Sequence, residues 1–555
     1  MCLRMNGISA LPLIAFAALI GPATAATVYL YPSENIQSVV NSNPAGTTYI
    51  FTPGVYRMQS ISPKSGDSYI GQSGAVLNGS RQATSFSQEN VNGITYWVTS
   101  GPSRAGTTVG TCDSSHPMCR YPEDLFINNQ AIQRVSSLSA VTSTTCYFNY
   151  STSKIYFLAS PTGKTVEVGT TPTAFWAPVS NVKIQSLTVE KYATPAQSGA
   201  IKASTSWTIS NNEVRYNHGA GIQAGNSSVI KSNYVHHNGQ VGVTAGGASS
   251  VLVQDNEVSY NNVDGFDFSW QAGGVYLANA TSPVIKGNYV HDNKGMGIHL
   301  DYQAYNWLIQ ANRTQNNYFA GIDNEIGYNG TASYNISVND GTWPGKTNPS
   351  MWWGCGIYVY VSSYTTVYNN TVIHGTNGIC AASISRGSGN RGTFAVRNLS
   401  VSNNLIIQSA GAATGAVGQS SSDAVYSSSS NNHWNGNVYK LPSSSSASYV
   451  WDNRSMTASS WMAAGQDSSG TWVSSSDSSY PSSAFSQNET VLASGSTKVY
   501  SLPTTTSTLL KTEPNGAEGT ITKVAGPILT SGAWWWNVSF SDGTVGWSVQ
   551  TNLVK

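Results

Sequence analysis

The amino-acid sequence predicts an all-β solenoid in which short parallel strands wind into stacked coils. Three observations favour this fold class: an Asn-containing motif recurs along the middle of the chain, a Gly followed by an apolar residue recurs later in each repeat, and helical periodicity is nearly absent. Repeats of roughly 20–50 residues are typical of solenoids, because each unit buries its apolar face only against its neighbours.

The first repeated mark is an apolar residue followed three places later by Asn and usually, two places further on, by Val. The Asn residues are Asn212, Asn233, Asn256, Asn288 and Asn312, with weaker copies at Asn335, Asn370 and Asn404. Most steps between them are 21 to 24 residues, and the longer steps indicate inserted loops. Because Asn bonds neighbouring backbone and tolerates unusual dihedral angles, we expect these side chains to stack as a ladder at a bend.

The second mark is a Gly followed by an apolar residue. It occurs at Gly221, Gly242, Gly265, Gly297, Gly321, Gly356 and Gly378. Together the two marks predict two short strands per coil, each with side chains that alternate between the interior and the outer wall.

The amino-acid composition limits the classes of protein to which the chain can belong. Of the 555 residues only 10% are charged, whereas 11% are aromatic. Disordered chains are rich in charged residues and poor in aromatic ones, so we expect this chain to fold. The formal net charge is +1, which provides no basic field for nucleic acid. We therefore expect no nucleic-acid partner.

The first 25 residues have the pattern of an export signal: Arg4, an apolar run from Ile8 to Ile20, and small residues at 23–25. The run is too short for a membrane span of roughly 20 residues, and no later stretch is apolar enough. We therefore expect a secreted protein, extracellular or periplasmic, without a membrane span. Such a compartment permits disulfides, of which Cys112–Cys119 would close a short loop.

The remaining chain divides into further parts. Residues 26–480 form the predicted solenoid, entered by a short amphipathic helix at 33–41 and interrupted by a β-rich insertion near 100–175. A closing helix is expected at 459–465 and a Ser-rich linker at 474–485. Residues 486–555, with segments such as 499–503 and 534–538, form a different unit.

The repeats at 209–214, 230–235, 253–258, 285–290 and 309–314 resemble those of the pectin-lyase-like superfamily. The resemblance covers about residues 30–480 and implies a single-stranded right-handed parallel β-helix that acts on extracellular polysaccharide. The last 70 or so residues resemble the bacterial SH3-like module, a small β-barrel, which implies a cell-wall or substrate anchor, with a plain spacer as the alternative. We expect a monomer.

Aligning the coils on their Gly residues predicts a carboxylate-rich outer wall. Apolar residues dominate the first and third places after the Gly, so the second and fourth places face outward. One outward column then holds Asp267, His299 and Asp323, and the next holds Asp301 and Glu325. In a chain with only 26 acidic residues this is a dense patch.

Asp301 and Glu325 are 24 residues apart, which is one coil at the same register. Neighbouring coils lie about 4.8 Å apart, so this pair suits a retaining glycosidase, whereas diagonal pairs such as Asp301 with Asp323 suit an inverting one. We expect Asp301 and Glu325 to be the catalytic pair, with Asp323, Asp267 and His299 tuning or orienting them. Repulsion between neighbouring carboxylates raises the pKa of one of them.

Aromatic and amide side chains beside the acids are the expected substrate-binding residues, because sugar rings pack on aromatic planes. These residues are Tyr358, Tyr360, Trp353, Trp352, Trp270, Tyr302 and Gln271.

The leading hypothesis is a glycoside hydrolase that needs no cofactor or metal. One alternative is a Ca²⁺-dependent polysaccharide lyase or epimerase on a uronate polymer, since clustered carboxylates also suit a hard cation. The Arg or Lys base of pectate lyases, the DPH-type motif of alginate epimerases and the paired aspartates of polygalacturonases are not recognisable. Another alternative is a non-catalytic glycan-binding or adhesive solenoid.

Overall fold

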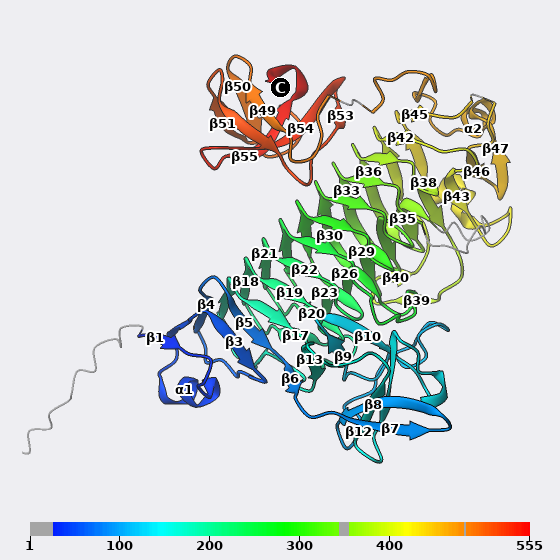
Figure 1. Ribbon diagram of the computed structural model, residues 1–555. Coiled ribbons are helices and arrows are strands. Elements are labelled where there is room, and N and C mark those ends of the chain that lie inside the picture. Colours follow the sequence, from blue (N-terminus) through cyan, green and yellow to red (C-terminus); the bar gives the residue numbers. More distant parts are fainter. Residues whose placement is uncertain (1–25, 343–353, 444, 482–483) are drawn as a thin grey trace, which may run out of the picture.

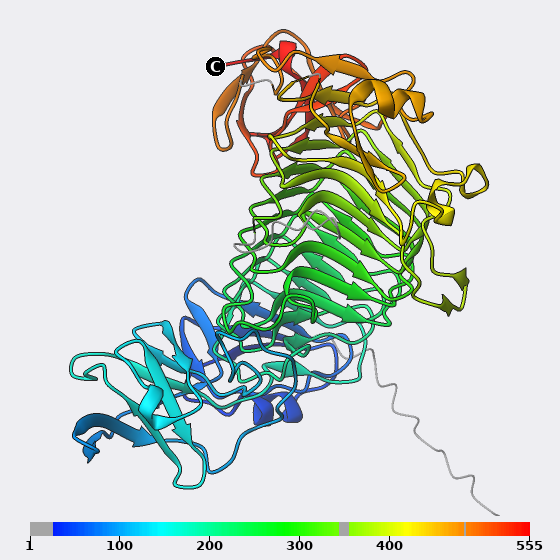
Figure 2. The ribbon, with the colours of Figure 1, turned by 90° about the vertical axis from the view of Figure 1, so that its right-hand side faces the viewer.

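The computed structural model describes residues 26–342, 354–443, 445–481 and 484–555. Its centre is a stack of coils in which each complete coil contributes one strand to each of three long parallel sheets, here called A, B and C (Figure 1). An insertion projects beside the N-terminal coils, and a separate C-terminal unit lies near the other end of the stack (Figure 2). The apolar core fills the interior of the coils, from Leu30 to Trp461.

The strands of the three sheets are short, and their bounds are as follows. Sheet A contains, in spatial order, β1 (Thr27–Leu30), β2 (Thr48–Phe51), β4 (Ser68–Gly71), β15 (Lys183–Gln185), β18 (Thr208–Ser210), β21 (Val229–Lys231), β24 (Leu252–Gln254), β27 (Val284–Lys286), β30 (Tyr305–Gln310), β33 (Tyr328–Ser333), β36 (Ser363–Tyr368), β41 (Ser400–Ser402) and β44 (His433–Asn435). Sheet B contains β3 (Gly54–Arg57), β5 (Ala75–Asn78), β16 (Thr188–Glu190), β19 (Glu213–Arg215), β22 (Tyr234–His236), β25 (Glu257–Ser259), β28 (Tyr289–His291), β31 (Arg313–Gln315), β34 (Ile336–Val338), β37 (Thr371–Ile373), β42 (Leu405–Ile407), β45 (Val438–Lys440) and β48 (Thr471–Val473). Sheet C contains β14 (Phe175–Trp176), β17 (Gly199–Lys202), β20 (Ala220–Gln223), β23 (Val241–Gly246), β26 (Gly273–Ala278), β29 (Met296–Asp301), β32 (Ile322–Glu325), β35 (Cys355–Tyr360), β38 (Asn377–Ala382), β43 (Thr414–Val417), β46 (Tyr449–Trp451) and the antiparallel β47 (Arg454–Met456).

The prediction of two strands per coil is wrong, because each coil has three. In one repeat, Ile209 belongs to sheet A, Val214 to sheet B and Ile222 to sheet C. The bend between sheets A and B takes only the two residues Asn211 and Asn212, so two strands appear in the sequence as one segment.

The predicted Asn ladder is confirmed and explains why this bend is repeated so regularly. Asn288 Nδ2 donates to Asn312 Oδ1 at 2.9 Å, and Asn312 Nδ2 donates to Asn335 Oδ1 at 3.0 Å. The same bond links the other members from Asn212 to Asn404 and continues to Asn437. A second ladder, five residues further along each coil, runs from Asn217 to Asn317 and ends on Asp340.

The α-helices among the described residues are short and lie at the two ends of the stack. The predicted entry helix is α1 (Ile36–Ser42), capped by Asn35 and buried through Ile36 and Val40. At the other end, α2 (Ala458–Ala463) packs Trp461 into the core. No helix among the described residues is long and apolar enough to cross a membrane.

The insertion begins about twenty residues earlier than predicted. Its sheet has the spatial order β6 (Ser80–Ala83), β13 (Val166–Gly169), β9 (Leu125–Ile127), β10 (Gln130–Arg134), β11 (Thr145–Asn149), β12 (Lys154–Phe157), β8 (Ile94–Ser100) and β7 (Ser87–Val91). A long segment between β8 and β9 crosses back to the coils and carries the disulfide Cys112–Cys119, as expected from the sequence. A second disulfide, Cys355–Cys380, joins two adjacent coils, and Cys146 is a buried free thiol.

The C-terminal unit has its own antiparallel sheet and apolar core. Its strands are β49 (Thr490–Ala493), β50 (Thr497–Tyr500), β51 (Leu509–Glu513), β52 (Glu518–Ile521), β53 (Ile528–Thr530), β54 (Ala533–Phe540), β55 (Val545–Val549) and β56 (Leu553–Val554). Trp535 and Trp547 of this unit share an apolar cluster with Tyr334 and Ile336 of the β-helix, so the unit is packed against the coils.

Candidate active site

Sheet C positions the predicted acidic patch. In the register of β26, β29, β32 and β35, Tyr276 lies beside His299, His299 beside Asp323, and Asp323 beside Tyr358. The residues on either side, such as Ile298 and Leu300, point into the core. His299 and Asp323 therefore share the outer column predicted for them.

Asp267 does not join this column, and its predicted alignment is wrong. It lies in the loop before β26, where its Oδ1 accepts hydrogen bonds from the backbone and hydroxyl of Ser269. The loop contains Gly265 followed by Phe266, which imitates the repeated mark. The Gly at the true register is Gly274, and it places Tyr276 in the column.

Asp301 and Glu325 end the strands of two adjacent coils, and they come together. One oxygen of each and one ring nitrogen of His299 all lie within 4.8 Å of one another. Tyr276 donates its hydroxyl proton to Asp301 Oδ2 at 2.9 Å, and the backbone N–H of Tyr302 donates to Oδ1 at 2.6 Å. These two bonds fix the orientation of the Asp301 carboxylate.

Glu325 is held by two cationic groups. Arg386 Nη1 lies 2.8 Å from Oε1, and His299 Nε2 lies 3.7 Å from Oε2. Burial alone would raise the pKa of Glu325, but His299 and Arg386 together outweigh it and lower the pKa. Arg386 comes from the segment that leads into the small hairpin β39 (Ser388–Gly389) and β40 (Gly392–Thr393).

His299 and Asp323 form the floor beneath this pair. Their side chains are 7% and 1% exposed, and Nε2 lies 3.3 Å from Asp323 Oδ2. Burial opposes the imidazolium, but Asp323, Glu325 and Asp301 outweigh it and raise the pKa of His299 to about 9. Burial, with the neighbouring carboxylates, raises the pKa of Asp323 well above its usual value. At neutral pH the imidazole of His299 therefore carries a proton.

The backbone after each acid adopts a left-handed conformation. Tyr302, after Asp301, has φ 42°, and Ile326, after Glu325, has φ 51°. The same conformation recurs at this corner of the neighbouring coils, at Asn279 (φ 50°) and Val361 (φ 51°), so it belongs to the turn that follows each of these sheet C strands. Ile326 is held in this conformation by two sets of contacts. Its N–H donates to the Tyr360 carbonyl at 2.9 Å, and its side chain packs with Tyr328, Val361 and Phe394.

The predicted substrate-binding residues differ in their surroundings. Tyr302 is 54% exposed, whereas Tyr358 is 4% exposed and stacks on Tyr360 at 5.4 Å, so Tyr358 presents no open face, contrary to the prediction. Trp270 stacks on Phe266, and Gln271 bonds Gln197, so both side chains already have partners near the loop that contains Asp267. Trp352 and Trp353 lie outside the described residues.

Two residues of the site were not predicted. Tyr276 follows Gly274 and was hidden by the misleading Gly265, so correct alignment of that coil would have found it. Arg386 carries no sequence signal, because it reaches Glu325 from 61 residues away through the docking of a loop.

Comparisons with known proteins agree with this architecture. Residues 174–371 match the family described as right handed beta helix region. The solved structure of XylC in complex with xylose is similar to this chain with a TM-score of 0.61 at 14% identity, covering 81% of this chain and 86% of that one. A structure described as a glycoside hydrolase has a TM-score of 0.41 at 10% identity, covering 71% and 96%. The A-module of the Azotobacter vinelandii mannuronan C-5 epimerase AlgE4 has a TM-score of 0.39 at 13% identity, covering 73% and 88%. No curated protein matches the chain. The chain thus contains a right-handed β-helix region and is similar in fold to XylC.

Proposed function

We propose that this protein is a secreted glycoside hydrolase that cleaves a polysaccharide or its fragments with retention of configuration. The observation that carries the proposal is the approach of Asp301 and Glu325, whose oxygens lie within 4.8 Å on adjacent coils. Retaining enzymes place their two carboxyl groups about 5 Å apart, because one must reach the anomeric carbon directly while the other reaches the leaving oxygen.

The surroundings of the two acids support a separate role for each. Asp301, oriented by Tyr276 and the Tyr302 backbone, attacks the anomeric carbon, and the bond to the leaving oxygen breaks. Glu325 protonates that oxygen with a proton supplied by the imidazolium of His299, 3.7 Å away. Glu325 then takes a proton from water, which hydrolyses the glycosyl ester and frees Asp301.

The experiment that tests this function is a panel of polysaccharides and aryl glycosides, with and without a chelator. Xylosides are assayed first, because XylC, the fold neighbour described above, was solved with xylose. New reducing ends without ultraviolet absorbance support the hydrolase. Binding without product would identify a glycan-binding solenoid instead.

One observation favours a second candidate, a cation-dependent lyase or epimerase. A ring nitrogen of His299 and oxygens of Asp301 and Glu325 converge as ligands of a metal ion would. That function predicts chelator-sensitive activity on a uronate polymer. A lyase would also give an unsaturated product that absorbs in the ultraviolet.

We predict that activity falls as the pH rises past about 9. The pKa of His299 is raised to about 9, so the proton that serves Glu325 is present below that pH and lost above it. Asp323→Asn removes a carboxylate that raises the pKa of His299, and we expect the basic limb to move to lower pH. The pH profile of kcat/KM measures both effects. A basic limb that stays in place in Asp323→Asn would contradict the role of His299 as the proton source.

Arg386→Met is expected to move the acidic side of the same pH profile to higher pH and to leave the basic limb, which follows His299, in place. The Arg386 guanidinium lowers the pKa of Glu325, so its loss lets Glu325 keep its proton to higher pH. Arg391→Met is the matched control, because Arg391 on the same hairpin lies 3.6 Å over the ring of Tyr305. The profile of the control should coincide with wild type.

We also propose export to an oxidising compartment and a monomeric state. The disulfides Cys112–Cys119 and Cys355–Cys380 support export, because such bonds persist outside the cytosol. The C-terminal unit is proposed to be an SH3-like anchor for cell wall or substrate, and co-sedimentation of the full chain with insoluble peptidoglycan or polysaccharide tests it.

A further inference from the structure

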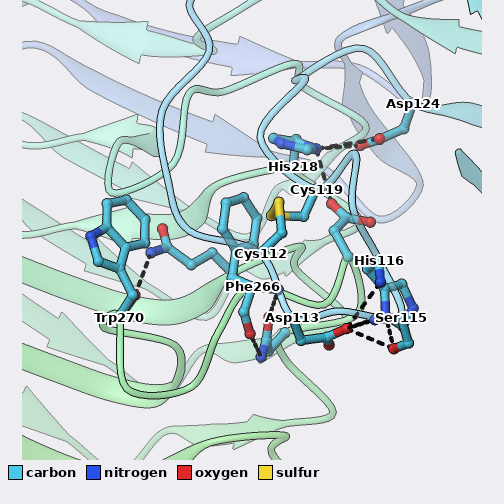
Figure 3. Close-up of a disulfide and its surroundings, with 12 residues drawn as sticks. Cys112, Asp113, Ser115, His116, Cys119, Asp124, His218, Phe266 and Trp270 are labelled. Carbon is cyan, nitrogen blue, oxygen red and sulfur yellow. Dashed lines mark hydrogen bonds and ion pairs between the residues drawn. A yellow bond between two sulfur atoms is a disulfide. The ribbon is translucent and has the colours of Figure 1, made fainter. Parts of the chain in front are cut away.

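A second cluster of titratable groups lies on the turns between sheets B and C, whereas Asp301 and Glu325 end strands of sheet C. It lines a pocket of about 850 Å³ between the insertion and the turns that lead from sheet B into sheet C. His218 stands at the centre, with Asp124 beside it and the disulfide Cys112–Cys119 and Phe266 nearby (Figure 3). Asp264, from the turn between β25 and β26, completes the cluster.

The three side chains converge on one point. His218 Nδ1 lies 3.0 Å from Asp124 Oδ2 and 2.9 Å from Asp264 Oδ2. One nitrogen and one oxygen from each acid all lie within 4.8 Å of one another. Two ligand atoms about 2.1 Å from one ion lie about 3 Å apart when they are adjacent, so the spacing suits coordination.

Hydrogen bonding does not account fully for this arrangement. The His218 side chain is 2% exposed, and its Nδ1 faces one oxygen of Asp124 and one of Asp264 at once. Asp264 Oδ2 is buried without a hydrogen bond, although it faces the imidazole. A single Nδ1–H points along one line and cannot donate well to two carboxylates at once.

The backbone leaves room for the cluster at one glycine. A Cβ at Gly239 would lie 2.0 Å from Asp264 Oδ2 and 1.9 Å from the His218 carbonyl oxygen. Any other residue at 239 would displace Asp264 from His218. The ligands also come from two distant parts of the chain, since Asp124 belongs to the insertion and His218 and Asp264 to the coils.

We propose that Asp124, His218 and Asp264 bind one divalent transition-metal ion that fastens the insertion to the β-helix. Imidazole with carboxylates suits Zn²⁺ or Mn²⁺, whereas Ca²⁺ prefers oxygen ligands alone. The two parts of the chain come together around the ion only in the folded state. Metal binding therefore stabilises that state.

The test uses the full chain, stripped with a chelator and then titrated calorimetrically with ZnCl₂ and, separately, CaCl₂. We expect one Zn²⁺ per chain, no comparable Ca²⁺ binding and a melting temperature that rises with Zn²⁺. Asp264→Asn and Asp124→Asn should abolish the Zn²⁺ response. Asp113→Asn is the matched control, because Asp113 lies in the same region but pairs with Ser115 and His116.

Circular dichroism before titration confirms that each variant is folded. The proposal is overturned if wild type binds no Zn²⁺, which would leave an imidazolium shared between two carboxylates. It is also overturned if Glu325→Gln, rather than Asp264→Asn, removes the bound ion, because the metal would then belong to the cluster on β29 and β32. If both folded Asn variants bind as wild type does, the three residues are not the ligands.

Discussion

Asp301→Asn and Glu325→Gln are each expected to lower kcat by about 10²- to 10⁴-fold on a glycoside with a poor leaving group. Asp301→Asn removes the attacking carboxylate, and Glu325→Gln removes the proton donor. Initial rates with wild type and the two variants, at saturating substrate, measure the effect.

The leaving group separates the two roles. A leaving group of low pKa departs without a proton, so Glu325→Gln should recover much of the bond-cleaving step on such a glycoside, whereas Asp301→Asn should not. Asp267→Asn is the matched control, because Asp267 lies in the loop before β26 and bonds Ser269. Full activity in both site variants, or a loss in the control as large as theirs, would contradict the assignment.

Asn312→Ala is expected to lower the free energy of unfolding by about 2–6 kcal/mol. The substitution leaves the Asn288 N–H without its acceptor and the Ile285 carbonyl without the Asn312 amide donor, both inside the stack. Each buried polar group that loses its partner costs about 1–3 kcal/mol.

Guanidinium unfolding, followed by tryptophan fluorescence, measures this cost. Gln310→Ala, two residues away in the sequence, is the control, because half-buried Gln310 makes one side-chain bond, to Ser333 at 3.2 Å. We expect the control to change stability by less than about 1 kcal/mol. Equal midpoints for the two variants would show that the ladder contributes little.

The sequence predicted the solenoid well because its restraints are local and repeated. Every coil must place an amide at the same bend, so Asn recurs with a visible period, and the second ladder could have been found from its constant spacing of five residues, as in Asn212 and Asn217. The number of strands could not be read in this way, because the first bend is too short to separate sheets A and B.

The sequence predicted those site residues that lie on regular strands, where side chains alternate with period 2. His299, Asp301, Asp323 and Glu325 lie on intact strands, so register alone brought them together. Asp267 failed because a loop was inserted within its coil. Arg386 and Asp124 were beyond prediction, since each reaches the coils from a segment whose docking depends on tertiary contacts.

The central claim is that Asp301 attacks the substrate, and covalent trapping tests it most directly. A fluorosugar inactivator slows hydrolysis of the glycosyl ester, and peptide mass spectrometry locates the label. The account predicts one glycosyl group on the peptide that contains Asp301, together with product of retained configuration. A label on any other residue, or a product of inverted configuration, would contradict it.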